Sequence, residues 1–84
     1  MTISAKAVRF DENTMWVDLA DGRTVGVPLA WFPRLLSATL QQRQQCRISP
    51  SGGGLHWDEI DEDISVPALL EGKRDLTRPA PKAA

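Results

Sequence analysis

Hydrophobic and polar residues alternate over the first thirty positions and predict three strands. Residues 3–10 place Val8 and Phe10 on one side and displace the basic residues from it, and a period of two is typical of a half-buried strand. Polar turn residues follow, and two more alternating segments cover 15–19 and 24–29. We therefore expect a three-stranded meander with one buried face.

The loop between the second and third strands decides which side chains share that face. An Asp-Gly pair, here at 21–22, normally marks a tight two-residue hairpin. Such a hairpin would turn the apolar residues of the two strands to opposite faces. A three-residue loop with a left-handed Gly22 and a bulge instead brings one apolar set together: Val17, Leu19, Val25 and Val27. We predict the bulged hairpin.

Short helical segments replace the alternation after the meander. Pro33 suits the first turn of a helix, where its missing N–H is harmless, and Leu35 and Leu36 would anchor that helix. Thr39 and the glutamine three residues later have the spacing of a capping box. A second helical turn is therefore expected over about 40–45, with its glutamines forming a solvated face.

A two-stranded ribbon is predicted next. Cys46 and Ile48 would face inward on a fourth strand, and residues 55–57 would return as a fifth. The intervening S-P-S-G-G-G at 49–54 is a turn sequence, because glycine adopts the backbone conformations that turns need.

A last short helix closes the folded part of the chain. Ser65 is expected to cap a helix over 66–71, and Gly72 to end it in the left-handed conformation. Residues 73–84 are polar and contain two prolines, which is typical of a flexible tail. The predicted fold class is α+β: a small domain over 1–72, with a three-stranded antiparallel meander, a second two-stranded ribbon and short helices.

Composition places this domain among ordinary proteins of the cytoplasm. Its 84 residues are 42% hydrophobic and 25% charged, which is usual for a soluble domain with a small core. The one cysteine excludes an internal disulfide and fits a reducing compartment. The N-terminus lacks the apolar stretch of a signal peptide, and no apolar run approaches the roughly 20 residues that span a bilayer. We expect a cytoplasmic location and no membrane.

Charge is nearly balanced overall but unevenly distributed. A net charge of −1 gives no bulk attraction to nucleic acid or to an acidic membrane. By segment, however, the charge is +3 over 31–54, −6 over 55–72 and +3 over 73–84.

An acidic run supplies most of the negative charge; its members are Asp58, Glu59, Asp61, Glu62 and Asp63. A calcium loop needs oxygen ligands at alternating positions and a sharp glycine turn. Ile60 occupies the third position here and no glycine turn follows, so we expect no metal. Two interpretations stay open: a solvated face from which Ile60 and Ile64 point inward, or a surface patch for a basic partner.

Trp31, Phe32 and Arg34 form a second candidate site. Tryptophan and arginine are enriched at the energetic centres of protein interfaces. The alternative is that one ring covers the open end of the small core while Arg34 pairs with the acidic run. Adjacent positions on an extended segment cannot both point inward, so one ring should be partly exposed.

Catalytic motifs fail on inspection. A thiol–imidazole pair of Cys46 and His56 would need both groups on one side, whereas alternation puts the cysteine inside and the histidine outside. The glycine turn at 49–54 precedes a strand and has no lysine nearby, unlike a phosphate-binding loop. We predict no enzymatic activity and no cofactor.

Two segments carry a family resemblance: D-G-R-T-V-G-V-P-L-A-W-F-P-R-L-L at 21–36 and G-G-G-L-H-W-D-E-I-D-E-D-I-S-V-P-A-L-L at 52–70. In this order they resemble the bacterial family of domain of unknown function 2442, over about residues 5–72. The resemblance implies a small α+β unit without an established activity. Leu40 stands where relatives often have proline, and Cys46 where many have tryptophan, so the core should be smaller there.

The same resemblance implies two kinds of role. Some relatives carry a helix-turn-helix domain after this unit, but the dozen or so residues that follow here cannot contain one. Other relatives are encoded beside a second small protein in a toxin–antitoxin-like arrangement, which implies a protein-binding role by analogy.

Three functional hypotheses follow. The first is a non-enzymatic protein-interaction module, the antitoxin-like or adaptor half of a two-protein system. Its partner would be another small protein or a second copy, bound by Trp31, Phe32, Arg34 and the acids over 58–63. The second is a nucleic-acid-associated regulator acting as an oligomer, with these candidate contacts: Arg34, Arg43, Arg47, Lys73 and Arg74. The third is an accessory subunit of a larger assembly.

Overall fold

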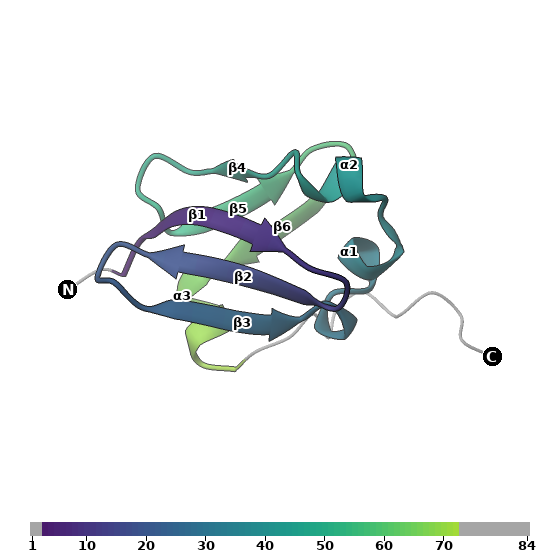
Figure 1. Cartoon of the computed structure of the whole chain (residues 1–84). Coiled ribbons are helices and arrows are strands. Elements are labelled where there is room, and N and C mark those ends of the chain that lie inside the picture. The colour runs from purple at the N-terminus through teal and green to yellow at the C-terminus, as the bar shows by residue number, and fades with distance from the viewer. Residues whose placement is uncertain (1–2, 73–84) are drawn as a thin grey trace.

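Two three-stranded antiparallel sheets frame the protein in its computed structural model, which describes residues 3–72 (Figure 1). The first sheet has the order β1-β2-β3 and contains β1 (Ala5–Phe10), β2 (Thr14–Leu19) and β3 (Thr24–Pro28). The second has the order β4-β5-β6 and contains β4 (Arg47–Ile48), β5 (Gly54–Trp57) and β6 (Glu62–Ser65). The predicted α+β class is confirmed. The predicted tail, 73–84, lies outside the described residues.

The β2–β3 loop is the bulged hairpin that the sequence predicts. Gly22 is left-handed, with φ +97°, and its N–H donates to the carbonyl of Leu19 at 3.1 Å. The N–H of Leu19 then donates to the carbonyl of Arg23 at 2.8 Å, which closes a three-residue loop. Val17 lies opposite Val25 in the resulting register, so the apolar residues of both strands share one face.

The second sheet differs from the prediction, because the expected two-stranded ribbon has a third strand. β6 pairs with β5, and Trp57 and Leu55 lie opposite Glu62 and Ile64. The side chains of β6 alternate between buried and exposed. A buried glutamate occupies one of the two inward positions, and this hid the strand in the hydrophobicity pattern.

Short helices join and cover the sheets: η1 (Leu29–Trp31), a 3-10 turn; α1 (Pro33–Ser37); α2 (Leu40–Arg43); and α3 (Val66–Leu70). The capping box of α2 is confirmed, since Thr39 Oγ1 accepts from the N–H of Gln42 and Gln42 Oε1 accepts from the N–H of Thr39. Ser65 caps α3 as predicted, and Gly72 follows it with φ +81°.

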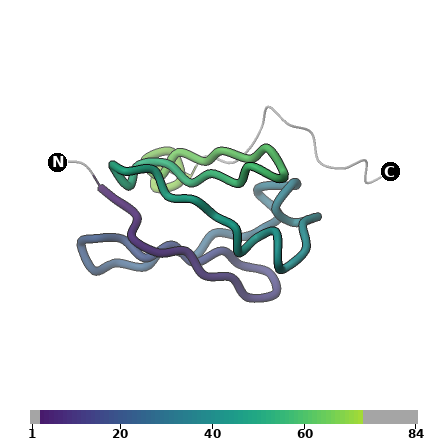
Figure 2. Tube along the Cα trace, turned by 90° about the horizontal axis from the view of Figure 1, so that it is seen from above, coloured from purple at the N-terminus to yellow at the C-terminus, as the bar shows by residue number. Residues whose placement is uncertain are grey.

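The core lies between the two sheets, which form two layers in Figure 2. Strands β2 and β3 contribute Met15, Val17, Leu19 and Val27, and strands β5 and β6 contribute Leu55, Trp57 and Ile64. The helical segments add Leu29, Phe32, Leu35, Val66 and Leu69. Leu35 is buried and anchors α1 as predicted. Leu36 was expected to do the same, but it is 46% exposed and does not.

Candidate functional site

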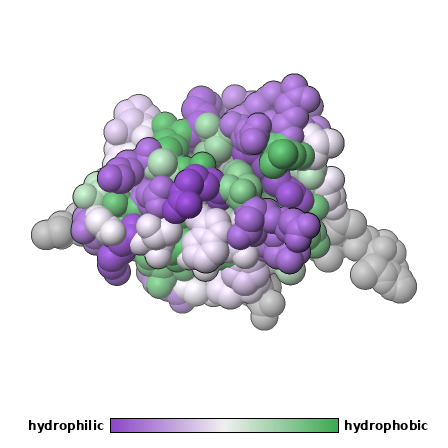
Figure 3. Space-filling view, in the orientation of Figure 1, coloured by the Kyte–Doolittle hydropathy of each residue, from purple (hydrophilic) through white to green (hydrophobic). Residues whose placement is uncertain are grey.

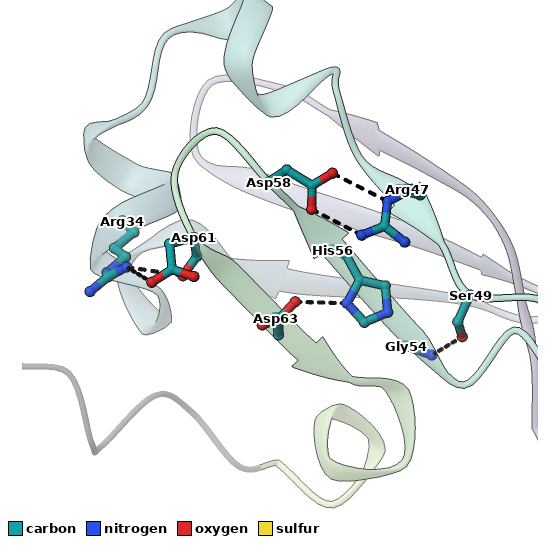
Figure 4. Close-up of polar contacts among 8 residues, drawn as sticks. All are labelled: Arg34, Arg47, Ser49, Gly54, His56, Asp58, Asp61 and Asp63. Atoms are coloured by element: carbon teal, nitrogen blue, oxygen red, sulfur yellow. Dashed lines mark hydrogen bonds and ion pairs between the residues drawn. The ribbon is translucent and has the colours of Figure 1, made fainter.

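One end of the molecule is built by the connection from β3 to β4, which contains η1, α1 and α2 (Figure 1). The β5–β6 turn lies against this connection. The Nη1 of Arg34 donates to the carbonyl of Asp61 at 2.9 Å and to that of Ile60 at 3.2 Å, and it approaches the Asp61 carboxylate at 3.3 Å (Figure 4). Gln42 Nε2 donates to Glu59 Oε2 at 3.0 Å. Arg34 therefore pairs with the acidic run, as one of the two interpretations predicted.

Arg43 fastens α2 to α1 and to the second sheet. Its guanidinium donates to the carbonyls of Leu35 and Leu36 at 2.8 and 2.9 Å, which satisfies groups at the end of α1. Its own carbonyl accepts from the indole Nε1–H of Trp57 at 2.9 Å. These bonds leave Leu36 and Leu40 facing outward, 46% and 58% exposed, and within residues 3–72 they are the two exposed large hydrophobic residues.

The neighbouring rings divide between core and surface. Phe32 is 5% exposed and belongs to the core, whereas Trp31 is only partly buried and packs against the core. The prediction that one of the two rings stays partly exposed is confirmed. Phe32 cannot form part of an exposed contact surface in this structure.

We use the name "helical end" for the surface that these segments present. Its residues are Trp31, Arg34, Leu36, Leu40, Glu59 and Asp61. They come from η1, α1, α2 and the β5–β6 turn.

The acidic run is divided among three environments and does not form one patch. Asp58 directly follows β5 and pairs with Arg47 of β4 at 2.9 Å, and Asp63 of β6 lies 2.7 Å from His56 Nδ1 of β5; both carboxylates are exposed (Figure 4). Glu59 and Asp61 lie in the β5–β6 turn, at the helical end. Glu62 is 2% exposed, so the expectation that it contributes to a surface patch is wrong.

Local electrostatics follow from these pairs. The hydrogen bond from Arg47 holds the pKa of the Asp58 carboxyl below its ordinary value, because it favours the ionised form. Asp61 adopts a left-handed conformation, φ +54°, which aspartate tolerates better than most residues. That conformation ends the turn where both the carbonyl and the carboxylate of Asp61 reach Arg34.

Three arginines proposed for nucleic-acid binding lie within residues 3–72, and each makes a contact within the chain. Arg34 binds the β5–β6 turn, Arg43 binds the end of α1, and Arg47 pairs with Asp58. They lie on different elements. Lys73 and Arg74 are outside the described residues, so contact of these cations with nucleic acid stays a prediction.

The Cys46 thiol meets the backbone of His56 and not its ring. Burial raises the pKa of the Cys46 thiol to about 11, so the thiol is protonated near neutral pH and is a poor nucleophile. The His56 ring instead binds Asp63. Within residues 3–72 no group of three or more side chains is arranged to hold a metal ion, and no helix is long and apolar enough to cross a membrane.

Sequence reasoning missed the exposed leucines and the buried glutamate. Leu36 directly follows Leu35, whose side chain is buried. A helix of only five residues buries side chains on one narrow face, so Leu36 is left exposed. Leu40 directly follows the cap residue Thr39 and begins α2, where no residue is buried. The capping box at Thr39, which places Leu40 at the start of a helix, could therefore have indicated that Leu40 is exposed.

Comparison with known proteins places the chain among relatives of unknown function. Residues 5–75 match the family model described as "Protein of unknown function (DUF2442)". A crystal structure of a protein of unknown function from Rhodospirillum rubrum is similar, with a TM-score of 0.80 and 30% identity over 92% of this chain and 95% of that one. The solution structure of an uncharacterized protein from Chromobacterium violaceum has a TM-score of 0.74 and 29% identity, over 88% of this chain and 70% of that one. No curated protein matches. The chain belongs to the family of domain of unknown function 2442, which its sequence motifs already resembled.

Proposed function

We propose that this chain is a non-enzymatic protein-interaction module, the antitoxin-like or adaptor half of a two-protein system, and that its partner binds the helical end. The observation that supports this proposal is the exposure of Leu36 and Leu40 within one short connection. Isolated exposed leucines are common on protein surfaces. Here two of them lie on successive short helices of the connection that also contains the partly buried Trp31, and such a set of residues suits the apolar centre of a protein interface.

The gain on binding would come from covering these leucines. Complete burial of one leucine side chain contributes about 1.5–3 kcal/mol, so half-exposed leucines still have part of that gain available. The capping box of α2 and the bonds from Arg43 already fix the backbone around both residues. Little ordering is then needed on association, which favours affinity.

Charged groups around the leucines would supply the polar rim. Arg34 is hydrogen-bonded to the β5–β6 turn, and Glu59 is hydrogen-bonded to Gln42. An apolar centre with a polar, solvated margin is the usual anatomy of an interface. The same surface suits a second small protein, a second copy of this chain or a neighbouring subunit of a larger assembly.

A pull-down from the source cells at moderate salt tests this proposal. The bait is the tagged full chain, and the test variant carries Leu36→Ser with Leu40→Ser. Lys6→Ser is the matched control, because it changes an exposed residue on β1, outside the helical end. Mass spectrometry and absorbance at 260 nm identify what is captured, and thermal unfolding checks that each variant is folded.

We expect a single stoichiometric protein with the unchanged chain and with the control, and its loss with the double variant. Capture that survives the double variant would place the interface elsewhere. Nucleic acid recovered without a stoichiometric protein would refute the module and favour the regulator.

A further inference from the structure

We propose that the free edge of β3 is a second docking site, which binds an extended segment of a partner protein, apolar in its middle, as a fourth strand of the first sheet. β3 is an edge strand in the order β1-β2-β3 and lies at the lower margin of that sheet in Figure 1. The backbone donors and acceptors along an exposed edge are a template for another strand. Strand addition takes affinity from these groups and specificity from the side chains around them.

The hydrogen bonds of the β2–β3 hairpin show which backbone groups of β3 point to the free edge. Residues on an antiparallel strand alternate between those bonded to the partner strand and those whose N–H and C=O point away from it. The N–H of Leu29 donates to the carbonyl of Asn13 at 2.9 Å, which makes this a bonded pair. Val27, two residues earlier, is therefore bonded to β2, whereas the backbone groups of Gly26 and Thr24 point away from it.

The edge is open along this stretch. Thr24, Gly26 and Pro28 are exposed, and among residues 3–72 the N–H of neither Thr24 nor Gly26 has an acceptor. α3 lies next to β3 in Figure 1, but Figure 2 shows it in the layer of the second sheet. A strand in the plane of the first sheet therefore has room beside β3. Pro28 has no N–H to offer, so it limits the length of the site.

On the outer face of the sheet, the ring of Trp16 fills the place of the side chain that Gly26 lacks. Trp16 lies opposite Gly26 on β2, and a Cβ on Gly26 would lie 2.5 Å from Cζ3 of that ring. The indole N–H donates to the Asp11 carboxylate at 2.9 Å, which helps to hold the ring there. Opposed residues on paired strands have Cβ atoms about 4.5–5.5 Å apart, so a residue opposite Gly26 on an added strand would contact this ring.

Apolar side chains suit both sides of such a strand. On the inner side, Val25 packs against the core but is only partly buried, so a residue opposite it would cover apolar surface. On the outer side, an aromatic residue opposite Gly26 would pair with Trp16, and aromatic pairs across strands are favourable. No residue of β3 is charged, and the lower middle of the face in Figure 3, over β2 and β3, has the pale colour of intermediate hydropathy. An aromatic residue between two aliphatic ones therefore complements this edge.

Titration of the ¹⁵N-labelled full chain with a capped peptide, Lys-Val-Tyr-Val-Thr-Glu, tests the proposal. When the peptide runs antiparallel to β3, its tyrosine lies opposite Gly26 and its valines opposite Val25 and Val27. We expect saturable shifts at the amides of Thr24 and Gly26, with a dissociation constant of about 1 mM or tighter, and slower exchange of both amides with solvent. A peptide with serine in place of tyrosine should bind at least about threefold more weakly, because it loses the contact with Trp16.

N-methylation of the peptide separates strand addition from other binding. The tyrosine N–H of the added strand faces β3, whereas the N–H of each neighbouring valine points away from it. Methylation of the tyrosine nitrogen should therefore weaken binding at least about tenfold, and methylation of the first valine nitrogen less than about twofold. Equal effects of the two methyl groups, or no shifts at Thr24 and Gly26, would overturn the proposal.

Two substitutions at one position give the matching test on the protein. Thr24→Pro removes an edge N–H that β2 does not use, and it should weaken peptide binding at least about fivefold. Thr24→Ala loses the same side chain but keeps that N–H, so its affinity should stay within about twofold of the unchanged chain. Equal affinities of the two variants would contradict strand addition. If Thr24→Pro does not fold, the two methylated peptides decide.

Other occupants give different results, each of which would also overturn the proposal. Shifts at the Thr24 and Gly26 amides that depend on protein concentration would indicate a second copy of the chain. Shifts at these amides in the Leu76→Ser variant without peptide would indicate the chain's own segment 73–84. The edge of β3 is distinct from the helical end, so the Leu36→Ser, Leu40→Ser variant should bind the peptide unchanged. Failure of either proposal therefore leaves the other standing.

Discussion

Replacing Gly52 by alanine should cost clearly more stability than the same change at Gly22. Both glycines are left-handed, with φ +77° and +97°, so each alanine pays a similar backbone penalty of about 1–2 kcal/mol. A Cβ on Gly22 would meet no atom within 4 Å. A Cβ on Gly52 would lie 2.6 Å from the Cβ of Ser4 and 3.1 Å from the carbonyl oxygen of Ala5, which is a clash with the chain that enters β1.

The size of that clash sets the expected difference. Overpacking in a tight site costs about 1–3 kcal/mol, so we expect a loss of about 1–2 kcal/mol for Gly22→Ala and about 2–5 kcal/mol for Gly52→Ala. Urea unfolding followed by tryptophan fluorescence measures both values. In a domain of this size each kcal/mol lowers Tm by about 4–8 °C, which gives a second measurement. Equal losses would show that the glycine turn does not pack against the start of β1.

Three further predictions follow from single contacts. Thr39→Ala should lose about 1 kcal/mol in urea unfolding, because it removes one half of the capping box; an unchanged midpoint would mean that α2 does not need its cap. Trp57→Phe should lose about 2–4 kcal/mol, since it leaves a small void and removes the donor to the Arg43 carbonyl, and a loss below 1 kcal/mol would contradict this packing. Side-chain hydrogen bonds hold the pKa values of the Asp11 and Asp18 carboxyls below their ordinary values. The stability that these two carboxylates contribute is therefore present above the unfolded pKa of about 3.9 and is lost as pH falls below it. Tm measured from pH 6 to 2.5 should therefore fall below pH 4, and Asp18→Asn should flatten that fall if the assignment is right.

Local rules predicted the parts of the fold that local chemistry determines. The bulged β2–β3 hairpin followed from two constraints, a glycine that tolerates a positive φ and the need to place Val17 and Val25 on one face. The capping box at Thr39 and the left-handed Gly72 followed in the same way. Each of these features depends on residues close together in the sequence, so no knowledge of the packed structure was needed.

Features that depend on the packed structure could not be predicted. β6 was missed because Glu62 occupies an inward position, and an acid there breaks the pattern by which a buried strand is detected. The exposure of Leu36 depends on which side of α1 meets the core. The contact between β1 and β4 arises from the placement of the two sheets, which hydrophobic periodicity within each strand does not specify.

The distribution of charge is the reason that we propose the leucines, rather than the acidic run, as the contact for a partner. Asp58 and Asp63 already pair with Arg47 and His56 at exposed positions, where water and salt screen such pairs and they contribute little. A basic partner would have to replace these pairs and desolvate its own cations, so the net gain would be small. Covering Leu36 removes apolar surface from water and separates no ion pair. Hydrophobic burial at the helical end therefore offers the larger net free energy of association.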